Sequence, residues 1–429
     1  MEEWKEYKLG DMVQIKGGKR LPKGVGLSSI PNSHPYIKIR NLGSTRILEL
    51  NETYEYVDDV TQKTISRYIV NSGDILLSIV GTIGLTGIVG DSLDNANLTE
   101  NCVKIIGLNG LNSMFLYYFL LSQIGQKEIQ KGIVGAVQPK LPIKNIQDIT
   151  IKIPSITGQE RIAKVLSSID DKIELNNRIN HNLEAQAQAL YKSWFVDFEP
   201  FRGGKFVDSE LGLIPEGWRV GCYNDIISST VSGDWGKDRE VGNYTHKVSC
   251  IRGCDFADVS SGIRGKTPER FILEKNFKNK RLIDKDIVVE ISGGTPTVST
   301  GRICLVSDNL LDKYSGNIVC TNFCRVIRPC SGYSSYVFYS WLDKYKSRVM
   351  FGYENGTSGI KNFQISDFME KEPVIIPPRT VIAKFQTIVE VYQAVIQRNG
   401  NERMECETVR DTLLPKLMSG ELKISDLTC

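Results

Sequence analysis

Clustered lysine and arginine residues are the feature of this chain whose types and spacing could do chemistry. One cluster lies in a glycine-containing loop near the N-terminus and comprises Lys16, Lys19, Arg20 and Lys23. Cations and bare backbone N–H groups on one turn suit phosphate oxygens, and a solvated hairpin loop is the equally good alternative. Residues 264–285 hold five more cations than carboxylates, enough to contact several phosphates, although such runs are usually solvated surfaces. The candidates in this second cluster are Arg264, Lys266, Lys278, Lys280 and Arg281.

Five further polar side chains are placed where they could reach the edges of bases. Arg40 and Arg252 lie on predicted strands at matching places, and a forked guanidinium can donate to guanine O6 and N7. The competing interpretation of each arginine is an internal ion pair with a neighbouring carboxylate. Gln138 and Lys140 lie in a loop before a closing strand, where plain loop polarity is the alternative. Lys361 matches Lys140 later in the chain.

The sequence holds no constellation typical of a catalytic site. It lacks the G-x-x-x-x-G-K-[ST] loop that cradles nucleotide phosphates, and no glycine-rich turn is followed by the acidic residue of a dinucleotide or methyl-donor site. Only His34, His181 and His246 could serve as imidazole bases or ligands. The Pro377-Pro378 pair lacks the flanking residues that amino-methyltransferases use and is typical of a stop before a helix. We therefore expect a chain that binds and does not catalyse.

Composition and cysteine usage indicate a cytoplasmic globular protein. The 429 residues carry a net charge of +3, with 41% hydrophobic and 24% charged residues, so any nucleic-acid surface must be local. No apolar run reaches the roughly 18 residues that a membrane span needs, and the charged N-terminus has no apolar signal core. The ten cysteines form no C-x-x-C motif. The spacings Cys250/Cys254 and Cys320/Cys324 leave a zinc site open, but reduced core cysteines are favoured.

Two long helices are the elements that must position these residues. In residues 157–201, apolar side chains recur every seven positions from Ile162 to Leu190, with Asn176 in the same series, after a T-x-x-E capping box. A helix of roughly 40 residues is about 60 Å long and needs a second helix to cover its apolar stripe. Residues 381–417 supply one, with a kink or frayed turn expected at Asn399-Gly400. We predict an antiparallel, coiled-coil-like pair in which Asn176 sets the register.

The segments outside these helices follow one plan twice, at a separation of roughly 211 to 223 residues. The strand predicted at 35–43 returns at 248–256, with Arg252 against Arg40, and the strand pair at 72–90 returns at 285–306, with Asp286 against Asp74. We predict an α+β fold in which two structurally repeated β-rich domains are separated by the two long helices. The expected boundaries are 1–156 for the first domain, 157–201 for the central helix, 202–377 for the second domain and 378–429 for the C-terminal helix.

Four sequence motifs of the chain are typical of one protein family. They are P-x-x-x-x-Q-E-R-I-A from Pro154, ALYKSWFVDF at 189–198, IPEGWRV at 214–220 and RDTLLPKLMSGEL at 410–422. With the duplicated plan, they make essentially the whole chain resemble the specificity subunit of type I restriction–modification enzymes. The resemblance implies two target-recognition domains, each reading half of a bipartite site in double-stranded DNA, and helices that bind two modification subunits.

The same resemblance assigns the catalysis to partner subunits. Modification subunits would transfer a methyl group from S-adenosylmethionine to adenine N6, and restriction subunits would add a nuclease that depends on ATP and Mg²⁺, so this chain is expected to bind none of these cofactors. Two alternatives remain. One is a coiled-coil interaction scaffold without nucleic-acid binding, and the other is a self-sufficient DNA methyltransferase, for which the sequence shows no methyl-donor motif. The bases recognised depend on loop geometry and DNA shape as well as on side-chain identity.

Overall fold

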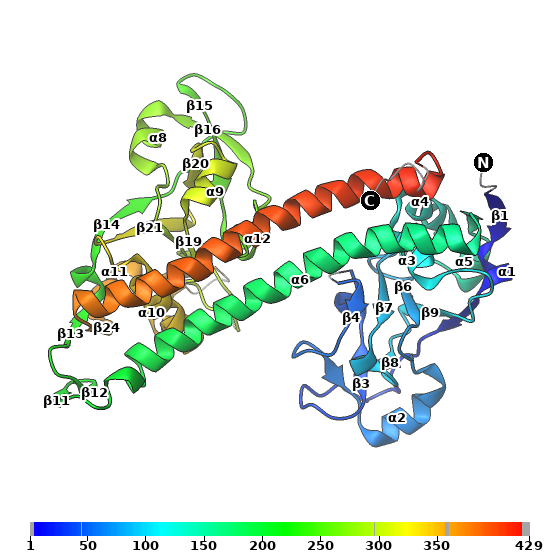
Figure 1. Ribbon diagram of the computed structural model, residues 1–429, viewed down its shortest axis with the longest axis horizontal. Coiled ribbons are helices and arrows are strands. Elements are labelled where there is room, and N and C mark those ends of the chain that lie inside the picture. Colours follow the sequence, from blue (N-terminus) through cyan, green and yellow to red (C-terminus); the bar gives the residue numbers. More distant parts are fainter. Residues whose placement is uncertain (1–3, 44, 296, 357–359, 423–429) are drawn as a thin grey trace. The chain divides into compact units, whose positions relative to one another are not determined.

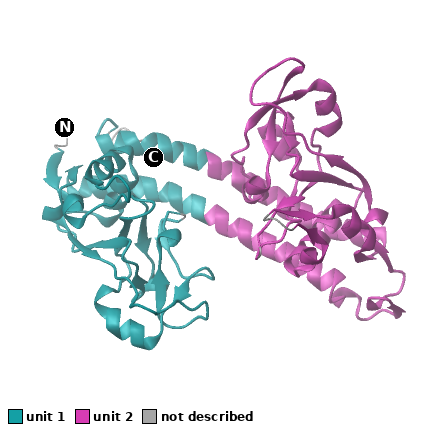
Figure 2. Ribbon diagram, turned by 180° about the vertical axis from the view of Figure 1, so that it is seen from behind, with its two compact units in different colours: residues 1–174, 405–429 teal, residues 175–404 magenta. Residues whose placement is uncertain are grey.

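The computed structural model of the chain describes residues 4–43, 45–295, 297–356 and 360–422. Two compact units make up the chain, residues 1–174 with 405–429 and residues 175–404 (Figure 2). Two long helices, α6 (Ile156–Phe195) and α12 (Arg379–Ser419), each contribute one segment to each unit (Figure 1). Both units also contain sheets and shorter helices, which confirms the predicted α+β class.

A five-stranded sheet and a three-stranded sheet form the framework of the first unit. In spatial order the larger sheet consists of β2 (Gln14–Gly17), β9 (Cys102–Ile106), β6 (Ile75–Ser78), β7 (Thr86–Val89) and β4 (Ile47–Leu48). The smaller sheet consists of β5 (Glu55–Tyr56), β3 (Pro35–Ile37) and β8 (Asn97–Leu98), and β1 (Lys5–Lys8) pairs with β10 (Thr150–Ile153). Side chains of β6 alternate between two cores: Ile75 and Leu77 pack on one side and Leu76 on the other, so the whole strand is buried.

Five short helices complete the described part of the first unit. They are α1 (Leu9–Met12), α2 (Asp59–Ile65), α3 (Ser113–Leu121), α4 (Gln123–Gly132) and α5 (Ile143–Gln147). The phrase MFLYYFLL lies in α3, whose first turn is capped by Asn112, because the Asn112 side chain accepts a 3.0 Å hydrogen bond from the Phe115 N–H. Residues 115–120 of α3 are all buried, which confirms the interpretation of this apolar run as a buried helix.

The second unit has a four-stranded and a three-stranded sheet. The first consists of β14 (Ile227–Ser232), β21 (Cys324–Pro329), β17 (Ile287–Glu290) and β19 (Ile303–Leu305), and the second of β16 (Glu269–Leu273), β15 (Tyr244–Ile251) and β20 (Ile318–Cys320). Smaller sheets are β11 (Phe206–Ser209) with β12 (Gly212–Pro215), β13 (Arg219–Cys222) with β24 (Pro373–Ile376), and β18 (Ser292–Gly293), β23 (Lys361–Phe363) and β22 (Glu354–Asn355). The shorter helices are α7 (Phe256–Ser260), α8 (Glu274–Lys280), α9 (Asp308–Lys313), α10 (Ser334–Lys346) and α11 (Ile365–Lys371). Fully buried Trp341 of α10 packs its ring against Tyr223, Phe363 and Phe368 in the core of this unit.

The same backbone hydrogen bonds recur in both units and confirm the predicted duplication. Strand β3 pairs in parallel with β8, and β15 pairs in parallel with β20. The Lys19 N–H donates to the Leu98 carbonyl at 2.9 Å, as the Asp234 N–H does to the Cys320 carbonyl at 2.8 Å. The Leu141 N–H donates to Ile79 and the Phe363 N–H to Ile291, both at 2.9 Å.

These bonds fix the register of the repeat and correct two of the predicted matches. The Thr99 N–H donates to Ile37 and the Thr321 N–H to Ile251, so Arg252 corresponds to Lys38 and not to Arg40. Matching Ile39-Arg40 to Ile251-Arg252 by residue type is therefore wrong by two residues, because Ile37-Lys38 occupies the equivalent place beside the parallel strand. Lys140 bridges Val80, whereas Asn362 pairs with Ser292, so Asn362 rather than Lys361 corresponds to Lys140. The match of Asp286 with Asp74 is correct, because each carboxylate accepts from the backbone N–H three residues before it.

The central helix is shorter than predicted at its C-terminal end. It begins at Ile156, where Ser155 rather than Thr157 supplies the cap, because Ser155 Oγ accepts from the Gly158 N–H at 3.2 Å. It ends at Phe195 rather than near residue 201. Phe198 has a φ of 54°, and Glu199–Phe201 form a separate 3₁₀ turn, so the chain leaves the helix before Pro200.

The expected frayed turn at Asn399-Gly400 is wrong, because both residues are helical within α12, and the alternative of a kink stays a prediction. Packing explains the composition here. A Cβ added to Gly400 would lie 2.2 Å from the carbonyl oxygen of Gly262, so the helix can approach that loop only with glycine. The glycine therefore serves a close contact and does not end the helix.

Within each unit the segments of α6 and α12 pack antiparallel. In the second unit Asn176 Nδ2 donates to Glu402 Oε2 at 3.0 Å, whereas Tyr191, further along α6, contacts Phe385, which lies earlier in α12. In the first unit Ile162 shares a core with Leu417, and Asp170 pairs with Arg410 at 3.0 Å. Residue numbers thus fall along α12 as they rise along α6, as predicted. Asn176 is 2% exposed, and its role in setting the register stays a prediction.

Candidate nucleic-acid interface

A groove of about 440 Å³ lies beside the basic loop of the first unit. Its lining residues are Arg20, Leu21, Leu27, Tyr36, Lys38, Ile39, Arg40 and Thr99 to Asn101. Gly18 brings the loop to this groove: its N–H donates to the Cys102 carbonyl at 3.0 Å, and an added Cβ would lie 2.0 Å from the Thr99 carbonyl oxygen. Only glycine permits that approach, and Gly233 lies equally close to Thr321 in the second unit.

Carboxylates hold the arginines of this groove. Arg20 is 82% exposed and pairs with Glu100 at 2.8 Å. Arg40 lies in the 3₁₀ turn η1 (Ile39–Asn41) rather than on a strand, and it shares Glu55 with Lys38. The hydrogen bond from Lys38 is the main reason that the pKa of Glu55 is lowered, so the carboxylate stays ionised. Arg40 therefore makes an ion pair, but its side chain remains 56% exposed, and its contact with a base stays a prediction.

The other candidates of the first unit lie at its surface. Lys16 is exposed on β2, Lys19 lies with its Nζ 5.4 Å from the Tyr68 ring centroid, and Lys23 is exposed in the loop. Gln138 and Lys140 are exposed in a tight loop closed by two 2.9 Å backbone bonds between Val134 and Lys140. This loop adjoins the groove, since Lys140 bridges Val80 and the next residue, Gly81, faces Ile39 at the groove wall.

Arg252 of the second unit is held more tightly than Arg40. Its Nε and Nη2 donate to Asp255 at 3.0 and 3.1 Å, and Nη2 also donates to the Lys266 carbonyl at 2.7 Å. Asp255 belongs to the 3₁₀ turn η6 (Gly253–Asp255) and is 2% exposed. Arg252 follows β15 rather than lying on it. The ion-pair interpretation is again correct, and the side chain of Lys266 remains exposed.

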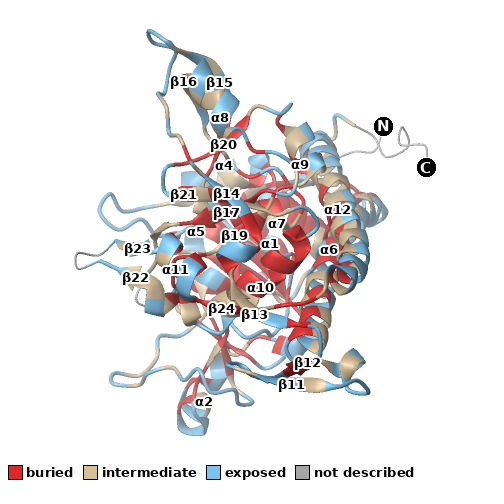
Figure 3. Cartoon of the chain, turned by 90° about the vertical axis from the view of Figure 1, so that its left-hand side faces the viewer, coloured by how far each residue is buried: buried red, intermediate tan, exposed pale blue. Residues whose placement is uncertain are grey.

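The remaining cations of the second unit divide into two groups. Lys280 and Lys361 have structural contacts: Lys280 Nζ donates to the Gly233 carbonyl at 2.9 Å, and Lys361 Nζ to Glu354 at 2.7 Å. Lys278, Arg281 and Arg264 are exposed, although Arg264 stacks on the Tyr314 ring at 4.7 Å. Helix α8, which carries Lys278, has no buried residue (Figure 3). The exposed cations are thus weakly held, Lys278 by Glu274 at 3.8 Å and Arg264 by the Tyr314 ring, whereas Lys280 helps to position the backbone.

Comparison with known proteins shows which proteins this chain is similar to. A family model described as "Type I restriction modification DNA specificity domain" matches residues 1–185. The MjaIX specificity subunit of Methanocaldococcus jannaschii is 28% identical over 99% of this chain and 95% of its own length. The HindI specificity subunit of Haemophilus influenzae is 24% identical, covering 98% of this chain and 100% of its own. Residues 1–185 thus match the type I specificity domain, and over nearly its whole length the chain is similar to these two specificity subunits.

A solved structure has a similar fold. The type I restriction–modification S subunit from M. genitalium matches 97% of this chain and 96% of its own length, with a TM-score of 0.55 and 16% sequence identity. The duplicated β-rich arrangement with two long helices is therefore a fold that this chain shares with that S subunit.

Two further cations were not identified from the sequence. Lys38 lines the groove beside Arg40, and its position is visible only once the sheet register is known. Arg302 precedes β19 and pairs through two hydrogen bonds with Glu290 at the end of β17. The available sequence signal was an arginine directly after the glycine-rich loop 293–301 and a glutamate three residues before the loop begins.

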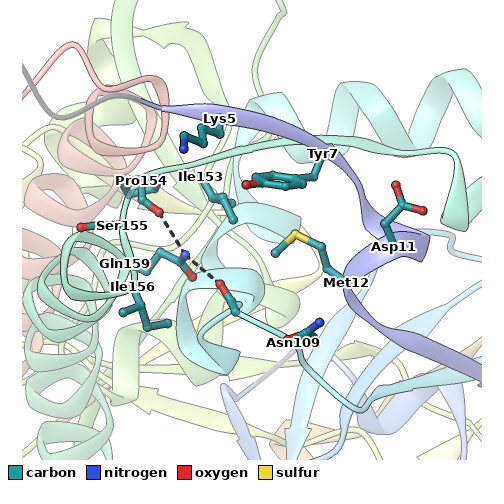
Figure 4. A pocket seen from close by; sticks show the side chains of 11 residues that line it. Lys5, Tyr7, Asp11, Met12, Asn109, Ile153, Pro154, Ser155, Ile156 and Gln159 are labelled. Atoms are coloured by element: carbon teal, nitrogen blue, oxygen red, sulfur yellow. Dashed lines mark hydrogen bonds between the residues drawn. The ribbon is translucent and has the colours of Figure 1, made fainter.

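A second concave surface lies at the start of the long helix in each unit. In the first unit a groove of about 660 Å³ is bordered by Lys5, Tyr7, Asp11, Asn109 and Gln159 (Figure 4). Gln159 is 1% exposed and donates to the carbonyls of Gly110 and Pro154, each at 3.2 Å, so it fixes the helix start. The second unit has a smaller groove of about 320 Å³ at the start of α12.

The described part of the chain has neither a metal-binding cluster nor a helix able to span a membrane. Among these residues, no group of three or more His, Cys, Asp or Glu side chains is placed to hold a metal ion. Cys250, Cys320 and Cys324 are buried free thiols, and burial raises the pKa of Cys250 and of Cys324 to about 12. No helix in the described residues has the length and apolarity of a membrane span.

Proposed function

We propose that this chain reads a bipartite site in double-stranded DNA, with one half-site for each unit, and directs adenine methylation by partner subunits. The observation that carries the proposal is a backbone frame that occurs twice with different polar side chains on it. At the turn after β3 the first unit presents Lys38 and Asn41, and at the same turn after β15 the second presents Arg252 and Asp255. One frame with two sets of donors and acceptors suits two half-sites of different sequence.

The exposed cations supply the part of binding that does not depend on sequence. Lys16, Lys19 and Lys23 in the first unit, and Lys266, Lys278 and Arg281 in the second, are exposed and suit phosphate oxygens. Arginines pinned by carboxylates, such as Arg40, hold a fixed geometry and suit base edges. Phosphate contacts would position the chain, and the pinned side chains would select the bases.

The chemistry belongs to partners in this proposal. Two modification subunits would bind along α6 and α12 and carry S-adenosylmethionine, and restriction subunits would carry ATP with Mg²⁺. The sequence supports this division, because it contains neither a nucleotide-phosphate loop nor a methyl-donor turn. The scaffold alternative predicts a chain that self-associates and leaves DNA unbound.

Single-molecule methylation sequencing tests the proposal. DNA from cells that express this chain with its modification subunit should carry methyl-adenine in a motif of two short half-sites separated by a spacer of fixed length. The chain alone, shown free of partner by mass spectrometry, should leave DNA unmethylated. A contiguous motif, or methylation by the chain alone, would contradict the proposal.

A further inference from the structure

We infer that Arg302, held by Glu290, is a specificity-determining residue that donates to a guanine edge in the major groove; this inference rests on the function proposed above. Arg302 Nε donates to Glu290 Oε2 at 2.8 Å, and Nη2 donates to Glu290 Oε1 at 2.6 Å. The Glu290 side chain is 9% exposed, whereas that of Arg302 is 39% exposed. The Glu290 carboxylate is thus buried and fixes the arginine, whereas the Arg302 guanidinium remains accessible at the surface.

The bidentate ion pair leaves one edge of the Arg302 guanidinium available to donate hydrogen bonds. Within the described residues, Nη1 of Arg302 has no hydrogen-bond partner, and Nη2 has one N–H beyond the bond to Glu290. Two parallel N–H groups on this edge match guanine O6 and N7. Arg252 differs, because its Nη2 already donates to both Asp255 and Lys266. Of these two arginines, Arg302 therefore has the free forked edge, and Arg252 does not.

The ion pair lies at the turn that forms the candidate interface. A Cβ added to Gly253 of η6 would lie 2.2 Å from Glu290 Oε1 and 3.1 Å from Arg302 Nη2, so both side chains abut the turn that follows Arg252. The residue after Glu290, Ile291, donates its N–H at 2.9 Å to the carbonyl of Phe323, whose side chain is 56% exposed. An exposed aromatic ring and a fixed arginine thus lie on neighbouring loops.

The loop that leads to Arg302 is held at several points. The Gly301 N–H donates to the Glu290 carbonyl at 2.9 Å, and buried Trp341 Nε1 donates to the Gly301 carbonyl at 3.0 Å. Glu354 accepts from the Thr300 N–H at 2.6 Å and from Lys361 at 2.7 Å. A guanidinium fixed in this way loses little conformational freedom when it binds a base.

Comparison of the two units distinguishes the Glu290–Arg302 ion pair from the Asp286–Arg328 ion pair, whose role is structural. Asp74 pairs with Lys104 at 3.3 Å in the first unit, and Asp286 pairs with Arg328 at 3.0 Å in the second. This carboxylate thus has a cationic partner in both units, although Lys104 corresponds by strand register to Val326 and not to Arg328. The positions of Glu290 and Arg302 correspond to Ser78 and Leu85, because the Ser78 N–H donates to Leu85 as the Glu290 N–H donates to Arg302, both at 2.9 Å. The frame therefore folds without this ion pair in the first unit.

The test uses the full chain in complex with its modification subunit and S-adenosylmethionine. A DNA library randomised within both half-sites is methylated, and the modified sites are sequenced. Arg302→Gln removes the guanidinium, and Arg302→Lys keeps the charge without the fork. Both variants should lose preference for guanine at one position of one half-site by roughly 5- to 140-fold, the range of one bidentate contact, and keep every other position. Arg328→Gln is the matched control, which should lower the unfolding temperature and leave the motif unchanged.

A second measurement starts from the unaltered complex, whose folding no substitution disturbs. Replacing each guanine of the half-site by 7-deazaguanine removes the N7 acceptor, and one such replacement should weaken binding of the unaltered complex but should not weaken binding of the Arg302→Gln complex further. An unaltered complex that shows no bipartite motif would contradict the proposed function itself. A clear bipartite motif that neither Arg302 variant nor any 7-deazaguanine changes would overturn the inference alone. An even loss across all sequences would also overturn it, since that result indicates a phosphate contact.

Discussion

Asn399 Nδ2 donates a 2.9 Å hydrogen bond to Asn180 Oδ1 between the segments of α12 and α6 in the second unit. The two residues are 4% and 5% exposed, so water does not satisfy either amide. Asn180 Nδ2 in turn donates to the Ile396 carbonyl at 3.3 Å and the Ser261 carbonyl at 3.2 Å. A buried amide pair of this kind fixes one register between two helices, because any shift would leave polar groups unpaired.

Asn399→Ala should lower the free energy of unfolding by about 1–3 kcal/mol, because it leaves the Asn180 carbonyl oxygen buried without its donor. Urea unfolding followed by circular dichroism measures the change. Val391→Ala on the same helix, at a side chain that is 59% exposed, should change stability by less than about 0.5 kcal/mol. Equal effects of the two substitutions would show that the amide pair contributes nothing particular.

Lys278→Ala should weaken DNA binding evenly across sequences and reduce the slope of log K against log salt by about 0.9, the value for one phosphate contact. Lys278 is 72% exposed, and its ion pair with the exposed Glu274 on the same helix is 3.8 Å long, so the fold should change little. Lys280→Ala is the informative comparison: its Nζ donates to the Gly233 carbonyl, so that variant should also unfold at a lower temperature. Titrations of the complex at several salt concentrations give both numbers, and a base-specific effect of Lys278→Ala would contradict the phosphate assignment.

Arg40→Ala should relax one base position, at about 1–3 kcal/mol, and only in the half-site read by the first unit. The reason is that Glu55 fixes the arginine while 56% of its side chain stays exposed. Methylation of a randomised library reports both half-sites at once. A change in the half-site of the second unit would show that the units do not read separate half-sites.

Lys313 should make stability depend on pH in the alkaline range. Burial lowers its pKa from 10.5 to about 8, and its Nζ bonds the Gly262 carbonyl without a carboxylate partner among the described residues. Between pH 8 and 10.5 the unfolded chain binds the proton that the folded chain has lost, so stability rises with pH. Unfolding midpoints across this range should rise less for Lys313→Met than for the unaltered chain. Parallel pH profiles would mean that Lys313 keeps its ordinary pKa.

Insertion of four residues into both long helices, after Glu174 and after Met404, should lengthen the spacer between half-sites. Each helix gains about 6 Å, which is just under two base-pair steps of roughly 3.4 Å. Both insertions are needed, because cross-helix bonds such as Asn399 to Asn180 match α6 to α12 residue by residue. Methylation of a library with variable spacers should show a spacer longer by one or two base pairs and unchanged half-sites. Insertion into α6 alone should instead destabilise the chain, and an unchanged spacer after the paired insertion would exclude the helices as the ruler.

Local sequence determined most elements of this protein. Seven-residue periodicity predicts α6, the run MFLYYFLL predicts α3, and apolar alternation predicts the pair β6 and β7. These predictions succeed because burial of one face depends on residues a few positions apart. The repeat could be found in the same way, since the order of elements is itself a sequence property.

Only the tertiary structure decided which cations are free and which are anchored. Arg20 meets Glu100, 80 residues away, and Lys280 meets Gly233, 47 residues away, so sequence spacing gives no sign of either contact. The same holds for Gly400, whose local preference is to end a helix but which the approach of Gly262 makes necessary inside one. Electrostatic and steric interactions act through distances in space, and the fold sets those distances between residues that are remote in the chain.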